Sequence, residues 1–101
     1  QSLLRKLRKE RKINKEVESF ISFLTLEELI AVKLELASEM VKGKLFGFPI
    51  YNSTMQIVKE SLVKFALSST TSHKKAAFML GLSLSEIKRY IKKYEINKSL
   101  D

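Results

Sequence analysis

The sequence has no cysteine and a single histidine, His73. A disulfide framework, or a zinc site built from thiolates and imidazoles, therefore cannot form within one chain. The three glycines stand where helices or loops are expected to be punctuated, and no phosphate-binding glycine loop, nucleophile elbow or metal-ligand spacing is present. We expect a protein that is not an enzyme and uses no cofactor, with His73 exposed in the first turn of a helix.

Long hydrophobic runs are also lacking. The longest stretch without a charge, residues 45–58, contains Gly47 and Pro49, and a membrane span needs about 20 apolar residues. The basic start is not followed by the apolar run and cleavage site of a secretory signal. We expect a cytoplasmic protein with no membrane partner. Because the chain starts at Gln1 rather than methionine, it is also compatible with the C-terminal piece of a larger protein.

Positive charge is abundant, and it gathers at the two ends. The net charge is +8. Residues 1–24 carry seven basic and three acidic groups, residues 25–72 carry five of each, and residues 73–98 carry seven and two. This division predicts packing in the middle and contact with a polyanion at the ends. A fold of 101 residues buries a thin core, and dimerisation is a usual remedy.

The N-terminal segment is predicted to form one basic helix near residues 2–22. Residues 5–12 interrupt its apolar pattern with six basic residues in eight. Two roles stay open for this run: a solvated helix or linker, or an arm that contacts phosphates. Binding of RNA or an anionic membrane is a further alternative, although the run lacks a continuous apolar face. The apolar residues at helical spacing are Leu3, Leu7, Val17, Phe20, Ile21 and Leu24.

The second predicted helix spans residues 26–42. Thr25 and Glu28 have the spacing of a capping box, which starts a helix, and Gly43 stands where a left-handed residue would end it. Its apolar residues cover roughly 200° of the helical wheel, against about 100° for an ordinary surface helix. An arc this wide predicts packing on the same chain and on a second copy. Its members are Leu26, Leu29, Ile30, Val32, Leu34, Leu36, Ala37, Met40 and Val41.

The third predicted helix spans residues 51–68 and precedes a polar turn at 68–71. Asn52 or Ser53 can cap its start, with Gln56 completing a box from Ser53. Alternatively, Pro49 opens the helix one turn earlier. Its expected core stripe is Met55, Val58, Leu62, Phe65 and Ala66.

Two short helices, 73–80 and 84–94, are predicted next, joined by a turn. Ser72 can cap the first, and Gly81 permits the tight reversal that sends the second across it. Ser83 and Glu86 form a further capping box. The expected inward residues are Ala76, Ala77 and Leu80 on the first helix and Ile87, Ile91 and Tyr94 on the second.

The remaining side of helix 84–94 is polar and mostly basic. It carries Ser85, Lys88, Arg89, Lys92 and Lys93. A basic face on the second helix of a helix-turn-helix is what docking in the DNA major groove requires, because lysine and arginine neutralise phosphates while early residues meet base edges. A charged face that is merely solvated is the alternative.

Residues 72–97, SHKKAAFMLGLSLSEIKRYIKKYEIN, resemble the C-terminal helix-turn-helix of the Fis (factor for inversion stimulation) family, which also closes many bacterial enhancer-binding activators and response regulators. The two preceding helices stand where Fis has the pair that interlocks with its mate. Residues 1–24 have no counterpart. The packing and turn residues that carry the likeness are Ala76, Ala77, Leu80, Gly81, Leu82, Ile87, Ile91, Lys92 and Tyr94.

The resemblance implies which residues contact DNA. Leu84 departs from the family, because Fis has an arginine contact there, and Glu86 replaces a small hydroxyl residue. We favour a capping role for Glu86 over acceptance of a cytosine amino group. By resemblance the base or backbone contacts are Ser83, Leu84, Glu86, Lys88, Arg89 and Tyr90, and the phosphate contacts at the first helix are Ser72 and Lys74. Together with Lys75, Ser85, Lys92 and Lys93 these complete the predicted DNA-binding set.

The sequence thus predicts an all-α, four-helix Fis-like homodimer with a C-terminal helix-turn-helix and an additional N-terminal basic helix. The expected parts are a basic helix or arm (1–24), dimerisation helices (25–71) and a unit that binds double-stranded DNA (72–98). The expected function is that of a bacterial transcriptional regulator or nucleoid-associated protein. The alternatives are a fragment of a larger activator, with RNA polymerase or upstream regulatory domains as partners, and a protein-interaction module with little DNA binding.

Overall fold

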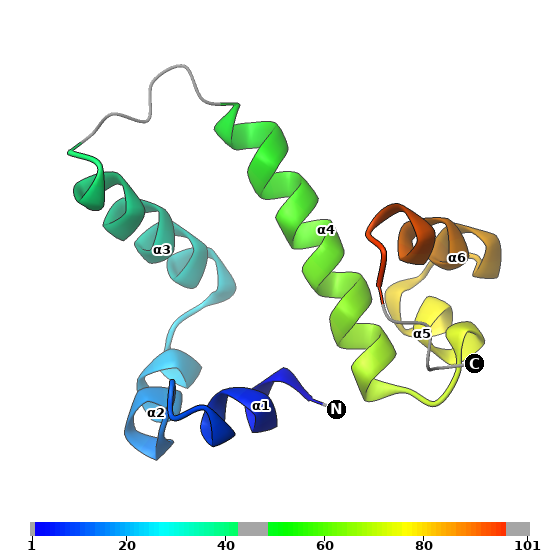
Figure 1. The fold of residues 1–101 in the computed structure, drawn as a ribbon, viewed down its shortest axis with the longest axis horizontal. Coiled ribbons are helices and arrows are strands. Elements are labelled where there is room, and N and C mark those ends of the chain that lie inside the picture. Colours follow the sequence, from blue (N-terminus) through cyan, green and yellow to red (C-terminus); the bar gives the residue numbers. More distant parts are fainter. Residues whose placement is uncertain (1, 43–48, 97–101) are drawn as a thin grey trace. The chain divides into compact units, whose positions relative to one another are not determined.

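The computed structural model describes residues 2–42 and 49–96, and all regular structure within these ranges is helical, as expected (Figure 1). These residues form two compact units. One comprises residues 2–6 and 51–96, and the other residues 7–42 and 49–50. The helices are α1 (Leu3–Lys9), α2 (Lys15–Phe23), α3 (Leu26–Met40), α4 (Ile50–Ser69), α5 (His73–Leu80) and α6 (Leu84–Lys93).

The single helix predicted for residues 2–22 is wrong, because the segment forms two helices, α1 and α2. The chain turns between them at Arg11, whose φ of 59° is left-handed. Asn14 then starts α2 as its N-cap, and its side chain accepts a hydrogen bond from the N–H of Val17 at 2.9 Å. Asparagine is a strong N-cap residue, and it imposes a new helix start where a continuous helix was expected.

A bidentate ion pair joins α1 to α2. The Arg8 guanidinium donates to both carboxylate oxygens of Glu18, from Nε at 2.7 Å and from Nη2 at 2.6 Å. This geometry is the strongest form of the arginine–carboxylate contact, and the hydrogen bonds hold the pKa of Glu18 below its ordinary value. Lys12 forms a second ion pair in this segment, with Glu10 at 3.4 Å, so two cations of the basic run are engaged within it.

Helix α3 begins as predicted. The Thr25 hydroxyl accepts from the N–H of Glu28 at 3.0 Å, and the Glu28 carboxylate accepts from the N–H of Thr25 at 2.9 Å. The helix ends at Met40, two residues early, and Lys42 follows with a left-handed φ of 54°. The stop expected at Gly43 lies outside the described residues. Within its unit α3 has no buried residue, so its wide apolar arc is largely exposed.

Helix α4 starts immediately after Pro49, which is the earlier of the two starts considered from the sequence. The caps proposed at Asn52 and Ser53 are therefore wrong, since both residues lie inside the first turn of the helix. A proline just before or at the first helical position loses no helix hydrogen bond, because those amides have no partner within the helix.

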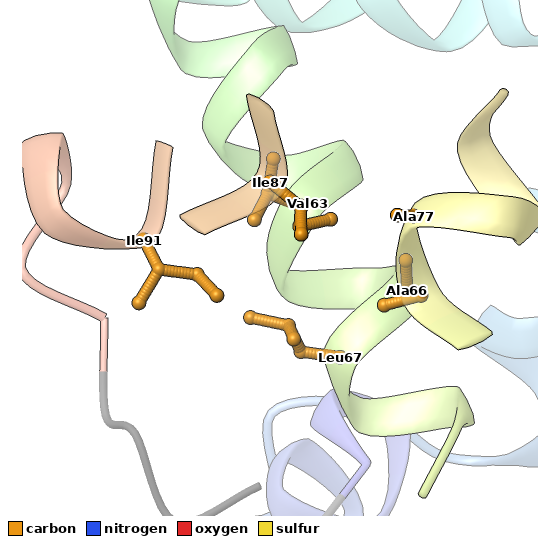
Figure 2. Close-up of a cluster of buried hydrophobic side chains, with 7 residues drawn as sticks. Val63, Ala66, Leu67, Ala77, Ile87 and Ile91 are labelled. Carbon is orange, nitrogen blue, oxygen red and sulfur yellow. The ribbon is translucent and has the colours of Figure 1, made fainter. Parts of the chain in front are cut away.

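The hydrophobic core of the C-terminal unit is built by α4, α5 and α6 (Figure 2). From α4 come Val63, Ala66 and Leu67, so the predicted stripe on this helix is wrong except for Ala66. Leu62 is 48% exposed and Phe65 is also exposed. The helix is apolar on more than one side, and packing against α5 and α6 selects the side that is buried. The other core residues are Ala76, Ala77, Ile87 and Ile91.

The inward residues predicted for α5 and α6 are confirmed except for Tyr94, which is half-buried and lies outside the core. Ala76 and Ala77 are buried, Leu80 packs against them, and Ile87 and Ile91 are almost completely inaccessible. His73 differs from expectation: it is only 9% exposed, although it is the first residue of α5. The imidazole is therefore enclosed by its surroundings rather than solvated.

Candidate nucleic-acid interface

Helices α5 and α6 pack on each other and are joined by a turn at residues 81–83 (Figure 1). Gly81 has φ 71° and ψ 29°, the left-handed conformation that glycine adopts without steric cost. The N–H of Leu82 bonds back to the carbonyl of Ala77 at 2.9 Å, which closes the end of α5. The chain therefore reverses within three residues and starts α6 at once.

Helix α6 separates an apolar side from a cationic side. Ile87, at 0% exposure, and Ile91 bury the first side in the core shown in Figure 2. The opposite side is exposed throughout and carries the predicted residues Ser85, Lys88, Arg89, Lys92 and Lys93. We call these five residues the basic face of α6.

The cations of this face form no ion pair with a carboxylate among residues 49–96. Among residues 49–96 the ion pair present joins Lys64 to Glu60 on α4, at 2.6 Å. Glu86, the acidic residue in the first turn of α6, interacts with the cap instead. The basic face therefore presents a positive field that an external anion can neutralise.

Ser83 and Glu86 form the predicted capping box. The Ser83 hydroxyl accepts from the N–H of Glu86 at 3.1 Å, and the Glu86 carboxylate accepts from the N–H of Ser83 at 3.0 Å. These hydrogen bonds, with a smaller contribution from the charge of Arg89, hold the pKa of Glu86 below its ordinary value. The carboxylate is thus directed at the cap, in accord with the role favoured from the sequence.

Two tyrosines connect the end of α6 to α4. The rings of Tyr90 and Tyr94 are stacked, with centroids 5.8 Å apart and planes within 5°. The Tyr94 hydroxyl donates to Oε1 of Gln56 at 3.3 Å, and desolvation raises the pKa of this phenol. Tyr90, predicted to contact DNA, is half-buried against the core, and the guanidinium of Arg89 lies over its ring.

The first turn of α5 brings further predicted residues beside α6. Ser72 is the N-cap of α5, and its hydroxyl accepts from the N–H of Lys75 at 3.1 Å. Lys75 also donates through Nζ to the Thr71 hydroxyl at 3.1 Å. Lys74 is exposed. The Ser72 hydroxyl therefore caps the helix, while both lysines of this turn remain exposed.

An open hollow of about 610 Å³ lies between the start of α5 and the start of α6. We call it the Phe78 hollow. It contains one residue that sequence reasoning did not single out, Phe78, whose side chain is 88% exposed. The signal was present, because Phe78 falls off the apolar stripe formed by Ala76, Ala77 and Leu80. The lining residues are Lys74, Lys75, Ala77, Phe78, Leu82 and Leu84.

In residues 2–42 and 49–96, no set of three or more histidine, cysteine or carboxylate side chains gathers to hold a metal ion. Within those ranges no helix has both the length and the apolar character to cross a membrane.

The chain was compared with protein-family models, with curated proteins and with solved structures, and nothing in any of the three matches it. The resemblance of residues 72–97 to the Fis family accordingly remains a prediction from the residues quoted for it.

Proposed function

We propose that α5 and α6 form a helix-turn-helix that binds double-stranded DNA, with α6 as the helix that enters the major groove. In this proposal the chain is a Fis-like bacterial transcriptional regulator or nucleoid-associated protein. It acts in the cytoplasm as a homodimer, either alone or as the C-terminal part of a larger activator.

The observation that carries the proposal is the division of α6 into two sides. Ile87 and Ile91 anchor one side in the core, and the other side exposes four cations that form no ion pair with a carboxylate of residues 49–96. The turn at Gly81 places this helix across α5 without a long loop. A rigidly held helix with one cationic side suits the major groove, which is wide enough to admit an α-helix.

Different cations are assigned different tasks. Arg89 and Lys88 occupy the middle of the basic face and are the candidates for contacts with base edges. Lys74, Lys92 and Lys93 are the candidates for flanking phosphates, which position the protein but carry no sequence information. Glu86 is assigned to the cap, because its carboxylate already bonds the N–H of Ser83.

The homodimer is proposed from α3, which has no buried residue although it is rich in leucine. When a second copy covers apolar side chains that are exposed on one copy, their removal from water lowers the free energy. Sedimentation velocity at tens of micromolar should detect a dimer. A monomer over this whole range would remove the dimer from the proposal.

The test is binding to mixed-sequence duplex DNA, measured by fluorescence anisotropy at two salt concentrations. The parent chain should bind, and log affinity should fall linearly with log salt because bound phosphates release counterions. A double variant, Lys88→Ala with Arg89→Ala, should bind much more weakly. Its matched control is Lys59→Ala with Lys64→Ala, which removes two positive charges from exposed positions of α4 in the same unit.

Two results would contradict the proposal. One is the absence of salt-dependent duplex binding by the folded parent chain, which would favour a protein-interaction module. The other is an equal loss of affinity in the α6 double variant and the α4 control, because binding would then follow net charge rather than the basic face. Circular dichroism of each variant checks that the helices are retained.

A further inference from the structure

The Phe78 hollow combines an apolar lining with a cationic rim. Phe78 is 88% exposed and Leu84 is 40% exposed, and both line it together with Lys74 and Lys75. Large apolar side chains on the face that carries the predicted DNA contacts are not explained by phosphate binding, because a phosphate gains nothing from them. They need an occupant that is itself partly apolar.

Leu84 has a particular position in this hollow. It is the first residue of α6 and follows the cap Ser83 directly. In a helix that docks in the major groove, the first residues are those that meet base edges. The neighbouring carboxylate of Glu86 is bonded to the N–H of Ser83 and is therefore turned back to the cap. At the N-terminal end of α6 the exposed side chain of Leu84 is therefore apolar, whereas the Glu86 carboxylate is occupied at the cap.

Among the groups that base pairs expose in the major groove, the largest apolar one is the C5-methyl of thymine; cytosine has only a C5–H at that place, and the hydrogen-bonding groups are donors or acceptors. A leucine side chain cannot satisfy a donor or an acceptor, and covering one would cost its hydrogen bond to water. It can cover a methyl group, and the burial of that methyl group lowers the free energy of binding. The chemistry of Leu84 therefore selects thymine among the four bases.

The rim of the hollow agrees with the same occupant. Each thymine of a duplex is flanked by phosphates, and Lys74 and Lys75 carry positive charge beside the apolar lining. A purely apolar partner would leave these two ammonium groups without a counter-charge. A nucleotide, with a methyl group and a phosphate a short distance apart, satisfies both parts of the lining.

We propose that Leu84 reads a thymine methyl in the major groove, that Phe78 covers the same methyl or its neighbour from α5, and that Lys74 and Lys75 hold the flanking phosphates. This inference rests on the proposed function and adds a base preference to it. Each half-site then contains a thymine opposite the start of α6, at the position where the Fis family uses an arginine.

The test replaces thymine by uracil, which removes the C5-methyl and keeps every hydrogen-bonding group of the base. Anisotropy titrations compare an alternating A·T duplex with its A·U counterpart. A second pair compares an alternating G·C duplex with one that carries 5-methylcytosine, which adds a methyl in the same groove. The parent chain should bind the methyl-bearing member of each pair about fourfold more tightly per half-site, the effect of burying one methyl group.

Variants assign the effect to Leu84. In Leu84→Ala both ratios should fall well below those of the parent chain, with the part contributed by Phe78 remaining. The matched control is Leu62→Ala, the same substitution at a residue on α4 that is 48% exposed, and it should keep both ratios. A Phe78→Ala variant should reduce the ratios without abolishing them.

The failures are distinguishable. If the folded parent chain binds no duplex, the proposed function itself fails. If it binds all duplexes and does not distinguish the members of either pair, the methyl contact is wrong while DNA binding stands, and the hollow is then a docking site for an acidic and apolar protein segment. If the ratios are unchanged in Leu84→Ala, another residue reads the methyl and the assignment to Leu84 is overturned.

Discussion

The guanidinium carbon of Arg89 lies 5.4 Å from the centre of the Tyr90 ring, which itself stacks on Tyr94. A cation over an aromatic face is held by the ring quadrupole, and Tyr90 is fixed because it packs against the core. The arginine of the basic face is therefore positioned by a ring that packs against the core.

This contact predicts coupling between Arg89 and Tyr90 in DNA binding. Tyr90→Leu should weaken binding, because the Arg89 side chain then loses more conformational entropy when it binds the duplex. In a double-mutant cycle with Arg89→Ala, the coupling should be about 0.5–1 kcal/mol. Anisotropy titrations of the four proteins provide the measurement. Strictly additive effects would mean that the ring does not position the arginine.

Arg89 and Lys93 should differ in kind as DNA contacts. Arg89→Ala should cost about 1–3 kcal/mol and relax preference at one base pair per half-site, provided that it contacts a guanine edge. Lys93→Ala should weaken binding to all sequences alike and lower the slope of log affinity against log salt by about one per lost contact in each half-site. Selection from random duplexes and salt titrations separate the two, and identical behaviour of the variants would refute the division of roles.

The capping box predicts a pH dependence of stability. The pKa of Glu86 is lowered in the folded chain, chiefly by the hydrogen bonds of the Ser83 backbone and side chain, so the unfolded chain binds the proton more readily. The stabilisation is complete above the unfolded pKa, about 4.3, and is lost as pH falls through the lower folded value. Glu86→Gln still accepts at the cap but does not titrate. The difference in stability between the parent chain and Glu86→Gln should therefore narrow as pH falls from about 7 to about 3, and thermal unfolding at each pH measures it.

The two hydroxyls at the start of α6 should have unequal effects on stability. Ser83→Ala removes the cap of the helix and should lower the free energy of unfolding by about 1 kcal/mol. Ser85 lies two residues further on, with its hydroxyl 3.1 Å from that of Ser83. Within the described part of α6, the Ser85 hydroxyl accepts from no backbone amide. Ser85→Ala should therefore be nearly neutral. Urea unfolding of both variants compares them, and equal losses would argue against the capping role.

The core of the C-terminal unit should depend strongly on Ile87. This side chain is completely buried, so Ile87→Ala should cost about 2–5 kcal/mol through lost burial and the remaining cavity. That is a large part of the stability of a small domain. Ile57→Ala, at an exposed position of α4, is the control. A comparable loss in both variants, measured by urea unfolding, would show that the described core does not dominate stability.

Helix starts were predicted correctly from the sequence where a capping box marks them. Thr25 with Glu28 and Ser83 with Glu86 each form the predicted box, because both bonds of a capping box close within four residues. Asn14 carries the same kind of signal and was overlooked, since the apolar residues around it continued at helical spacing. The basic side of α6 was also predictable, because the positions of Ile87 and Ile91 determine which residues face away from the core.

Signals that depend on partners were less informative. The buried side of α4 could not be chosen from its own residues, since Leu62 and Phe65 are as apolar as Val63 and Leu67. His73 was expected to be exposed in the first turn of a helix, but its burial comes from the packing around it rather than from its own helix.

What the sequence by itself determined is the set of local structures: helix starts, the left-handed Gly81, and a second helix with one apolar and one basic side. These follow from bonds and periodicity within a few residues. Only the tertiary structure decided which apolar side chains are buried and which remain exposed. Val63 is buried and the neighbouring Leu62 is not, because burial depends on surfaces contributed by residues distant in the chain. The pairing of Phe78 with Leu84 in one hollow is a consequence of that packing.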